Sequence, residues 1–357
     1  MDSQIIDSSS GLWLETLQAI RHDIYHLPEY FHTEAKRTRT IPEAILISEG
    51  TKILFVPYLL RKCDDIFRED LTCDDVFDII SPYGYTGIMF SPAAAEDKHF
   101  CNLAIEQLKS VLGEKNVCTG FFRLHPILNQ NIKEFFAADT YQGTGETVSI
   151  NLEQSPEEMW QDTRSTHRNI INKCKRSGMT ARFVPYEDYL DEFISIYNET
   201  MDRIGAKPLY YFDAEYYAGL RTLGDRIHLC IVEWENKIIS GALFTEVCGI
   251  VQYHLSGTRN EFLKHCPNRL LLDFARNWAK ERGNQVLHLG GGLGGAKDSL
   301  YEFKAGFSKQ RHEFATLRWI INPEKYQHLV QLRAKSLNTQ PETLLESSFF
   351  PAYRACL

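Results

Sequence analysis

The feature that most constrains the fold is an order of predicted elements that occurs twice. In each half of the 357-residue chain, a hairpin is followed by a strand, an amphipathic helix and a further strand. The two helices are expected at residues 99–115 and 267–283, the second with Pro267 at its start and Gly283 at its end. The offset between the halves is about 170–185 residues, so a domain-sized unit is used twice.

Three pairs of segments carry this correspondence between the halves. They are "KILFVPYLLR" (52–61) with "KIISGALFTE" (237–246), "GYTGIMF" (84–90) with "YHLSGT" (253–258), and "VCTGFFRLHP" (117–126) with "QVLHLGGG" (285–292). The first pair forms hairpins, with turns at "EGT" (49–51) and "EN" (235–236). The order predicts an α/β (α+β) protein with two tandem domains, each a mixed central sheet flanked by helices.

The domain boundary is expected near "GETVSINLEQSPEEMW" (145–160), where Ser155-Pro156 begins a new helix. We therefore predict an N-terminal domain over residues 1–148 and a C-terminal domain over 149–322. Residues 323–357 would form a tail with one helix, "PEKYQHLVQLRAKSL" (323–337).

Composition narrows the class of protein. The net charge of −8 disfavours a protein that coats DNA or RNA non-specifically. Nine cysteines without a CxxC pair favour reduced thiols over disulfides or a zinc site. The longest apolar run, Ile53–Leu60, is far shorter than the ~20 residues of a membrane span. We expect a cytoplasmic protein without a membrane span, a metal or a DNA partner.

Five glycines lie between Gly290 and Gly295, and Gly290, Gly292 and Gly295 satisfy the dinucleotide pattern G-x-G-x-x-G. A dinucleotide site also needs a crossover helix after the loop and an acid at the end of the next strand. The segment 296–310 is instead predicted to be irregular or a strand, and the next strand ends without an acid. A dinucleotide oxidoreductase is therefore a minor alternative, and the glycines are expected to allow a sharp turn and close backbone approach.

The chain resembles the GNAT acyltransferases of the FemABX-like type over residues 10–330. The strings that carry the resemblance are "SPYGYTG" (81–87), "FRLHPIL" (122–128), "TRSTHRNIINKCKRSGM" (163–179), "IYNETMDRIGA" (196–206), "YHLSGT" (253–258) and "HLGGGLGGAKDSLYEFKAGFS" (288–308). The studied members are peptidoglycan-bridge aminoacyltransferases, and other relatives are labelled acetyltransferases or are linked to polysaccharide assembly. The resemblance implies two tandem GNAT-like domains, with the catalytic groove in the second.

The same resemblance implies an N-acyltransferase. An amine of a cell-envelope, peptide or sugar-type acceptor would attack an acyl group carried by acyl-CoA or by the acceptor arm of an aminoacyl-tRNA. Both donors are co-substrates, and no tightly bound cofactor is implied. The alternative is a non-catalytic GNAT-like protein that binds a sugar or peptide during polysaccharide or envelope assembly.

The resemblance places the catalytic pair at Phe303 and Lys304. A lysine cation suits the oxyanion of acyl transfer or the leaving 3′-oxygen, and Phe303 would stack on a terminal base. From the residues alone, Lys304 is equally well a lysine that alternates outward from a strand beside core aromatics. The candidate substrate-binding residues are Tyr83, Tyr85, Arg164, Arg168, Tyr253, His254, Ser256, Asp298 and Tyr301.

The candidate donor-binding residues are Arg259, Lys264, Arg269, Gly291 and Gly292. GNAT enzymes that use acetyl-CoA place a glycine-rich turn before the helix that holds the pyrophosphate. The corresponding segment here, "SGTRNEFLKHCPNRLLLDF" (256–274), lacks that pattern, and Pro267 removes one N–H donor. This departure favours aminoacyl-tRNA modestly over acyl-CoA.

Overall fold

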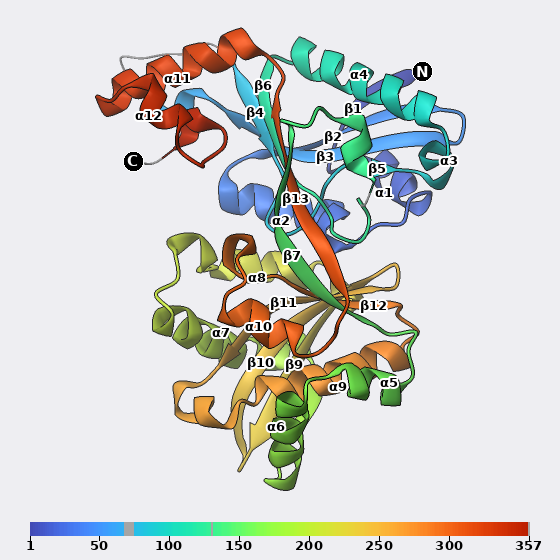
Figure 1. The fold of residues 1–357 in the computed structure, drawn as a ribbon, viewed down its shortest axis with the longest axis vertical. Coiled ribbons are helices and arrows are strands. Elements are labelled where there is room, and N and C mark those ends of the chain that lie inside the picture. Colours follow the sequence, from blue (N-terminus) through green and yellow to red (C-terminus); the bar gives the residue numbers. More distant parts are fainter. Residues whose placement is uncertain (68–74, 130, 356–357) are drawn as a thin grey trace. The chain divides into compact units, whose positions relative to one another are not determined.

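The computed structural model describes residues 1–67, 75–129 and 131–355. The chain divides into two compact units, Met1–Thr144 with Phe314–Leu357, and Gly145–Glu313 (Figure 1). The first boundary lies close to the predicted one. The C-terminal segment, which we predicted as a separate tail, belongs to the first unit.

The sheet of the first unit has the strand order β1-β2-β3-β4-β6-β13, with β5 paired to β3. Its strands are β1 (Asp2–Asp7), β2 (Ile41–Glu49), β3 (Lys52–Lys62), β4 (Phe77–Ile80), β5 (Met89–Phe90), β6 (Val117–Arg123) and β13 (Arg311–Ile320). Only β4 and β6 pair in parallel; the other pairs are antiparallel. The parallel pair needs a crossover, and helix α4 supplies it.

The helices of the first unit are α1 (Gly11–Gln18), α2 (Pro28–Thr38), α3 (Pro92–Ala95), α4 (Lys98–Glu114), α11 (Pro323–Leu337) and α12 (Pro341–Leu345). Helix α4 buries Phe100, Ala104, Leu108 and Leu112, which share one face at helical spacing. The C-terminal segment contacts the sheet through a hydrogen bond between two hydroxyls, those of Tyr353 and Thr119 on β6, which lie 2.7 Å apart.

The sheet of the second unit has the order β7-β12-β11-β10-β9-β8. Its strands are β7 (Tyr141–Asn151), β8 (Thr180–Val184), β9 (Ile227–Trp234), β10 (Lys237–Val247), β11 (Ile250–Thr258) and β12 (Val286–Gly290). Again one pair, β11 with β12, is parallel, and α9 connects its strands. The predicted hairpin turn at Glu235-Asn236 is confirmed, with φ values of 49° and 61°.

The helices of the second unit are α5 (Pro156–Asp162), α6 (Ser165–Arg176), α7 (Tyr186–Arg203), α8 (Ala214–Arg221), α9 (Asn268–Glu281) and α10 (Ser299–Ala305). Ser155 caps α5 at the predicted Ser-Pro start, because its side chain accepts from the Glu158 N–H. Helix α9 buries Leu271, Leu272, Ala275 and Ala279 in the core of this unit.

The two sheets have matching strand orders, so the predicted tandem mixed-sheet fold is confirmed. One predicted correspondence is wrong: β4, at residues 77–80, takes the place of β11, and "GYTGIMF" follows it largely as a loop. The sixth strand of each sheet comes from outside the repeat. Strand β13 pairs with β6 at Thr316–Ile320, and β7 pairs with β12 at Val148–Asn151.

Helix α10 corrects a second prediction, that residues 296–310 are irregular or a strand. The near-alternating aromatics suggested a strand, but Asp298 stabilises a helix start by accepting from the Tyr301 N–H at 2.9 Å. Phe303 then packs edge-on against Phe307, which lies just beyond the helix, with ring centroids 5.6 Å apart. Phe303 and Lys304 therefore lie on a short helix and not on a strand.

Candidate active site

The glycine stretch turns the chain sharply at the end of β12. Gly290 has a φ of 73°, a conformation that favours glycine. A Cβ on Gly292 would overlap the carbonyl oxygen of Ala296 and the carboxylate of Asp298. The glycines therefore serve backbone geometry, and the chain continues into the short α10 instead of a crossover helix, unlike a dinucleotide fold.

Asp298 joins the glycine turn to α10. Its two carboxylate oxygens accept from the N–H of Tyr301 and of Leu293, each at 2.9 Å. Asp298 is a candidate substrate-binding residue from the sequence, and in the structure its carboxylate caps α10. The cap fixes where α10 begins and hence where the Lys304 side chain is placed.

Lys304 is a buried cation at this turn. Its side chain lies against the turn and Nζ donates to the carbonyl oxygen of Gly291 at 2.6 Å, while the residue is only 8% exposed. Burial lowers the pKa of Lys304 to about 8, against the opposing effect of the Asp298 carboxylate. The amine is thus mostly protonated at neutral pH, with two N–H donors beyond the one used by Gly291.

Phe303 lies beside Arg269 and His167. The Arg269 guanidinium carbon is 5.5 Å from the centre of the Phe303 ring. Arg269 Nε also donates to His167 Nδ1 at 3.4 Å, and His167 Nε2 lies 2.9 Å from the carbonyl oxygen of Phe303. Burial lowers the pKa of His167. A neutral imidazole with its proton on Nε2 satisfies both contacts, so His167 links α6 and α9 to α10.

The start of α6 packs closely against the end of α10. The Arg164 N–H donates to the carbonyl oxygen of Gly306 at 2.8 Å, and a Cβ on Gly306 would overlap the His167 ring. The Arg164 guanidinium pairs with Glu302 at 2.8 Å, with both side chains about half exposed. Arg168 points elsewhere, toward the carbonyl oxygens of Trp160 and Gln161.

The predicted residues of β11 form two separate polar contacts. His254 Nε2 lies 2.9 Å from the Tyr216 hydroxyl, and both residues are buried. The Tyr253 hydroxyl donates to Ser256 at 2.6 Å, and burial raises the pKa of Tyr253 to about 12. The Tyr301 hydroxyl donates to Glu146 at 2.7 Å.

Two predicted donor ligands do not join the Lys304 group. Arg259 is held by Glu192 at 2.5 Å and Glu199 at 3.3 Å, which makes it a structural ion pair. Lys264 is exposed in the short helix Asn260–His265 that precedes α9. Arg269, Gly291 and Gly292, by contrast, all lie around α10.

Tyr83 and Tyr85 lie in the loop of the first unit that follows β4. The loop backbone is fixed at Tyr83, whose N–H donates to Glu34 at 3.0 Å and whose carbonyl oxygen accepts from the Tyr30 hydroxyl at 2.9 Å. Tyr85 packs edge-on against Phe314 at 5.3 Å. The contacts shown for both tyrosines therefore lie within the first unit.

Sequence reasoning missed His167, Tyr216 and Gly306. His167 lies in the lysine- and arginine-rich segment 163–179, three residues after Arg164. That spacing of about one helical turn is a signal that would have indicated it. Tyr216 contacts His254 across a separation of 38 residues, for which the sequence has no signal.

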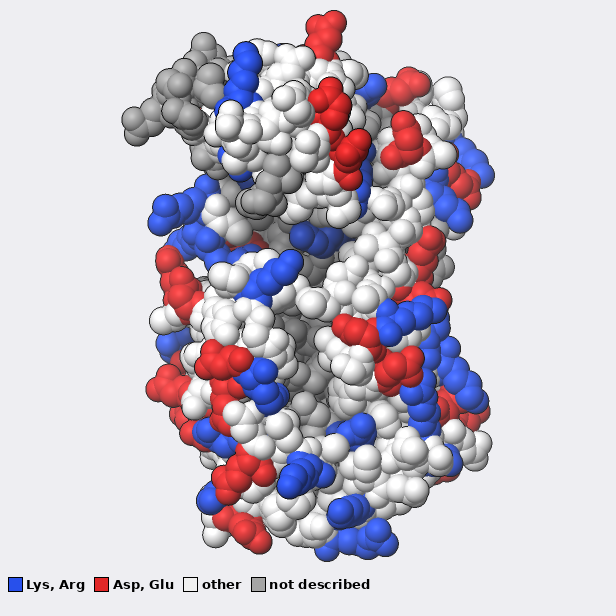
Figure 2. Space-filling model, turned by 60° about the vertical axis from the view of Figure 1, so that its left-hand side comes forward, with Lys and Arg blue, Asp and Glu red and all other residues white. Residues whose placement is uncertain are grey.

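The face of the molecule shown in Figure 2 carries no broad field of one sign. Lysine and arginine side chains are interspersed with acidic ones over the face shown in Figure 2. No helix within the described residues is long and apolar enough to cross a membrane. Over the same residues, no group of three or more His, Cys, Asp or Glu side chains is placed to hold a metal ion.

Comparison with known proteins shows a family domain and several structures that the chain resembles. Residues 161–304 match the family described as "Acetyltransferase (GNAT) domain". The crystal structure of FemX has a TM-score of 0.69 at 15% identity, over 92% of this chain and 99% of that one. L-PGS from Bacillus licheniformis has a TM-score of 0.56 at 13% identity, over 87% and 92%. The C-terminal domain of a putative lysylphosphatidylglycerol synthetase from Agrobacterium fabrum has 0.52 at 13%, over 87% and 91%.

No match is found among curated proteins. The family match covers α6 to Lys304, including the glycine turn and α10, so this part of the chain carries a GNAT acyltransferase domain. The chain has the fold of FemX over nine-tenths of its length.

Proposed function

We propose that this protein transfers an acyl or aminoacyl group to an amine of a cell-envelope, peptide or sugar-type acceptor in the cytoplasm, with Lys304 and Phe303 at the reaction centre. The observation that carries the proposal is the buried Lys304 ammonium at the glycine turn, 2.6 Å from the Gly291 carbonyl oxygen. A cation in a dry environment stabilises negative charge far better than one in water. The FemX-like fold supports an amine acceptor of this kind.

The chemistry requires one negative charge to be stabilised. The acceptor amine attacks the acyl carbonyl carbon, a C–N bond forms, and the carbonyl electron pair moves onto oxygen. Collapse breaks the bond to the ester oxygen or thioester sulfur. The attacking nitrogen loses one proton and the leaving group gains one, so charge balances. Lys304 would stabilise the oxyanion and, with a pKa of about 8, protonate the leaving atom.

Two donors fit this step, acyl-CoA and aminoacyl-tRNA. The GNAT family match supports acyl-CoA, the usual co-substrate of such domains. The connection from β11 to α9 supports the alternative, because it is a short helix ending at Pro267 and not a glycine-rich turn. Phe303 and Arg269 would hold the end of either donor.

The test is transfer itself. The purified chain is incubated with an amine library and, in separate arms, acetyl-CoA, longer acyl-CoAs and a charged tRNA pool, and products are read by mass spectrometry. Transfer in one arm, lost in Lys304→Ala, is the expected result. Absence of transfer in every arm, with the chain folded, would contradict the proposal. Lys309→Ala is the matched control, since Lys309 is 81% exposed and pairs with Asp162.

A further inference from the structure

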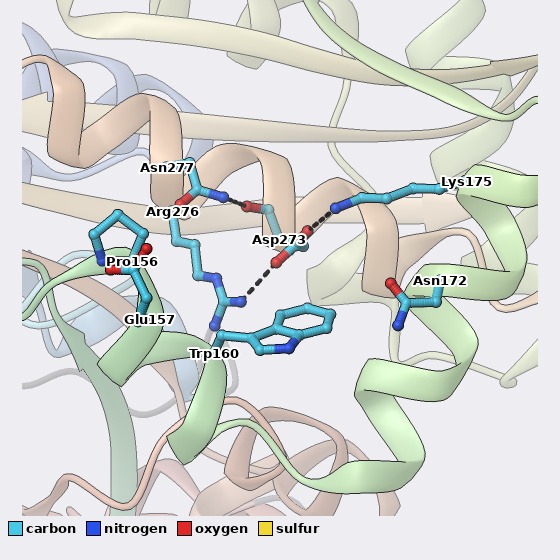
Figure 3. Close-up of a pocket in the computed structure, with 8 residues that line it drawn as sticks. All are labelled: Pro156, Glu157, Trp160, Asn172, Lys175, Asp273, Arg276 and Asn277. Atoms are coloured by element: carbon cyan, nitrogen blue, oxygen red, sulfur yellow. Dashed lines mark hydrogen bonds and ion pairs between the residues drawn. The ribbon is translucent and has the colours of Figure 1, made fainter.

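A pocket of about 300 Å³ lies between α5, α6 and α9, and the proposed chemistry does not use it (Figure 3). Its walls include an aromatic ring, two cations, a carboxylate and two amides, from Trp160, Asn172, Lys175, Asp273, Arg276 and Asn277. Glu157, which is exposed, also lines it. The volume is at the lower end of the range of small-molecule sites.

The inner wall places two cations, Lys175 and Arg276, against one buried carboxylate, Asp273, while the second carboxylate, Glu157, is exposed. Asp273 is buried and is shared by two cations, with Lys175 Nζ at 2.8 Å and an Arg276 nitrogen at 2.6 Å. Arg276 is fixed in the core by further bonds to the Thr163 hydroxyl at 2.7 Å and the Met159 carbonyl oxygen at 3.0 Å. Lys175 is about half exposed, at 52%, so its ammonium is free to turn toward a ligand while Arg276 still neutralises Asp273.

The aromatic wall lies next to both cations. Lys175 Nζ and the Arg276 guanidinium carbon are each 5.8 Å from the centre of the Trp160 ring. An indole beside a lysine suits a ligand that has a flat ring and an attached anion. The amide of Asn172, on the exposed side of α6, is able to hydrogen-bond the edge of such a ring.

We propose that this pocket binds a nucleotide unit of the acyl donor, with its base against Trp160 and its phosphate at Lys175. The inference rests on the proposed function. Helix α6 provides the connection, because His167 contacts Phe303 and Lys175 lies eight residues further on, about 12 Å along the helix axis. Two donors supply this chemistry: the phosphorylated adenosine of CoA and the unpaired 3′ end of tRNA.

The first test is binding, without chemistry, to the full chain. Adenosine 3′-phosphate, cytidine 5′-monophosphate and adenosine are titrated by calorimetry. Lys175→Gln is expected to weaken both nucleotides about tenfold, the scale of one charged hydrogen bond, and to leave adenosine unchanged. Trp160→Ala should abolish all binding and Trp160→Phe should retain part of it. Lys173→Gln, an exposed lysine of the same helix outside the pocket, should bind as the unchanged chain does.

Competition then identifies the source of the nucleotide. Desulfo-CoA and the single-stranded trinucleotide CCA are each tested for displacement of bound adenosine 3′-phosphate, and displacement by one of them is expected. The pocket assignment would be overturned if neither compound displaced the nucleotide, or if no nucleotide bound to the folded chain. It would also be overturned if Trp160→Ala and Lys175→Gln bound adenosine 3′-phosphate as tightly as the unchanged chain does. Binding is also measured on Lys304→Ala. Nucleotide binding without acyl transfer contradicts the proposed function alone, and transfer that is insensitive to Lys175→Gln and Trp160→Ala contradicts the pocket alone.

Discussion

Lys304 Nζ donates a hydrogen bond to the main-chain carbonyl oxygen of Gly291, 13 residues earlier in the chain. The bond joins the last turn of α10 to the glycine turn that follows β12. It holds a single ammonium where the chain leaves the sheet, with burial keeping its pKa near 8.

Replacing Lys304 should lower the acyl-transfer rate more than it lowers stability. Lys304→Ala removes the cation proposed for the oxyanion, and we expect kcat to fall by about 10²–10³-fold, as when one oxyanion donor is lost. Lys304→Arg keeps the charge but not the shape and should recover little. A Lys304→Ala chain with unchanged kcat would remove Lys304 from the mechanism.

Activity and stability should depend on pH in opposite directions around Lys304. The active cation is lost as pH rises through about 8, so transfer should decline there. The folded pKa lies below the unfolded value, so between about pH 8 and 10.5 the unfolded chain binds more protons and stability should rise with pH. Lys304→Met should lack this rise. Urea unfolding of both chains from pH 7 to 10.5 measures the difference, and parallel curves would refute the burial argument.

Asp298 should affect catalysis through position. Asp298→Ala removes the cap of α10, at a cost of about 1 kcal/mol of folding stability. It should also reduce kcat, because the start of the helix that carries Lys304 is no longer held in place. Asp298→Asn, which caps nearly as well, should restore most of the rate. Asn322 caps α11 in the first unit, so Asn322→Ala is the matched control. Asn322→Ala should lose similar stability and keep its kcat. If Asn322→Ala and Asp298→Ala lost kcat equally, Asp298 would have no positioning role.

Gly306 and His167 should be energetically coupled. A Cβ at 306 would overlap the His167 ring, so Gly306→Ala should destabilise the protein by about 1–3 kcal/mol. His167→Ala removes the ring, and the double variant should be less destabilised than the sum of the two changes. Chemical denaturation of the four chains completes the cycle. Additive effects would show that the two side chains do not meet.

The repeated fold was predictable because its signals are local. Hairpin turns such as Glu235-Asn236 and amphipathic helices such as α9 leave a pattern within a few residues. The sequence of helix α10 has a misleading pattern, because its near-alternating aromatics suggest a strand. Its helical start is stabilised by the Asp298 cap instead. The cluster of His167, Arg269 and Phe303 joins segments more than 30 residues apart, and only the family resemblance indicated two of its members.

The positions of β7 and β13 along the chain determine when each sheet becomes complete. The pairing residues of β7 lie at the start of the second unit, so all six strands of its sheet have been made once β12 has left the ribosome. The first unit waits for Thr316–Ile320 to cover β6, and these residues are synthesised after the whole second unit. During synthesis, the half of the chain that is made first is therefore the half whose sheet is completed last.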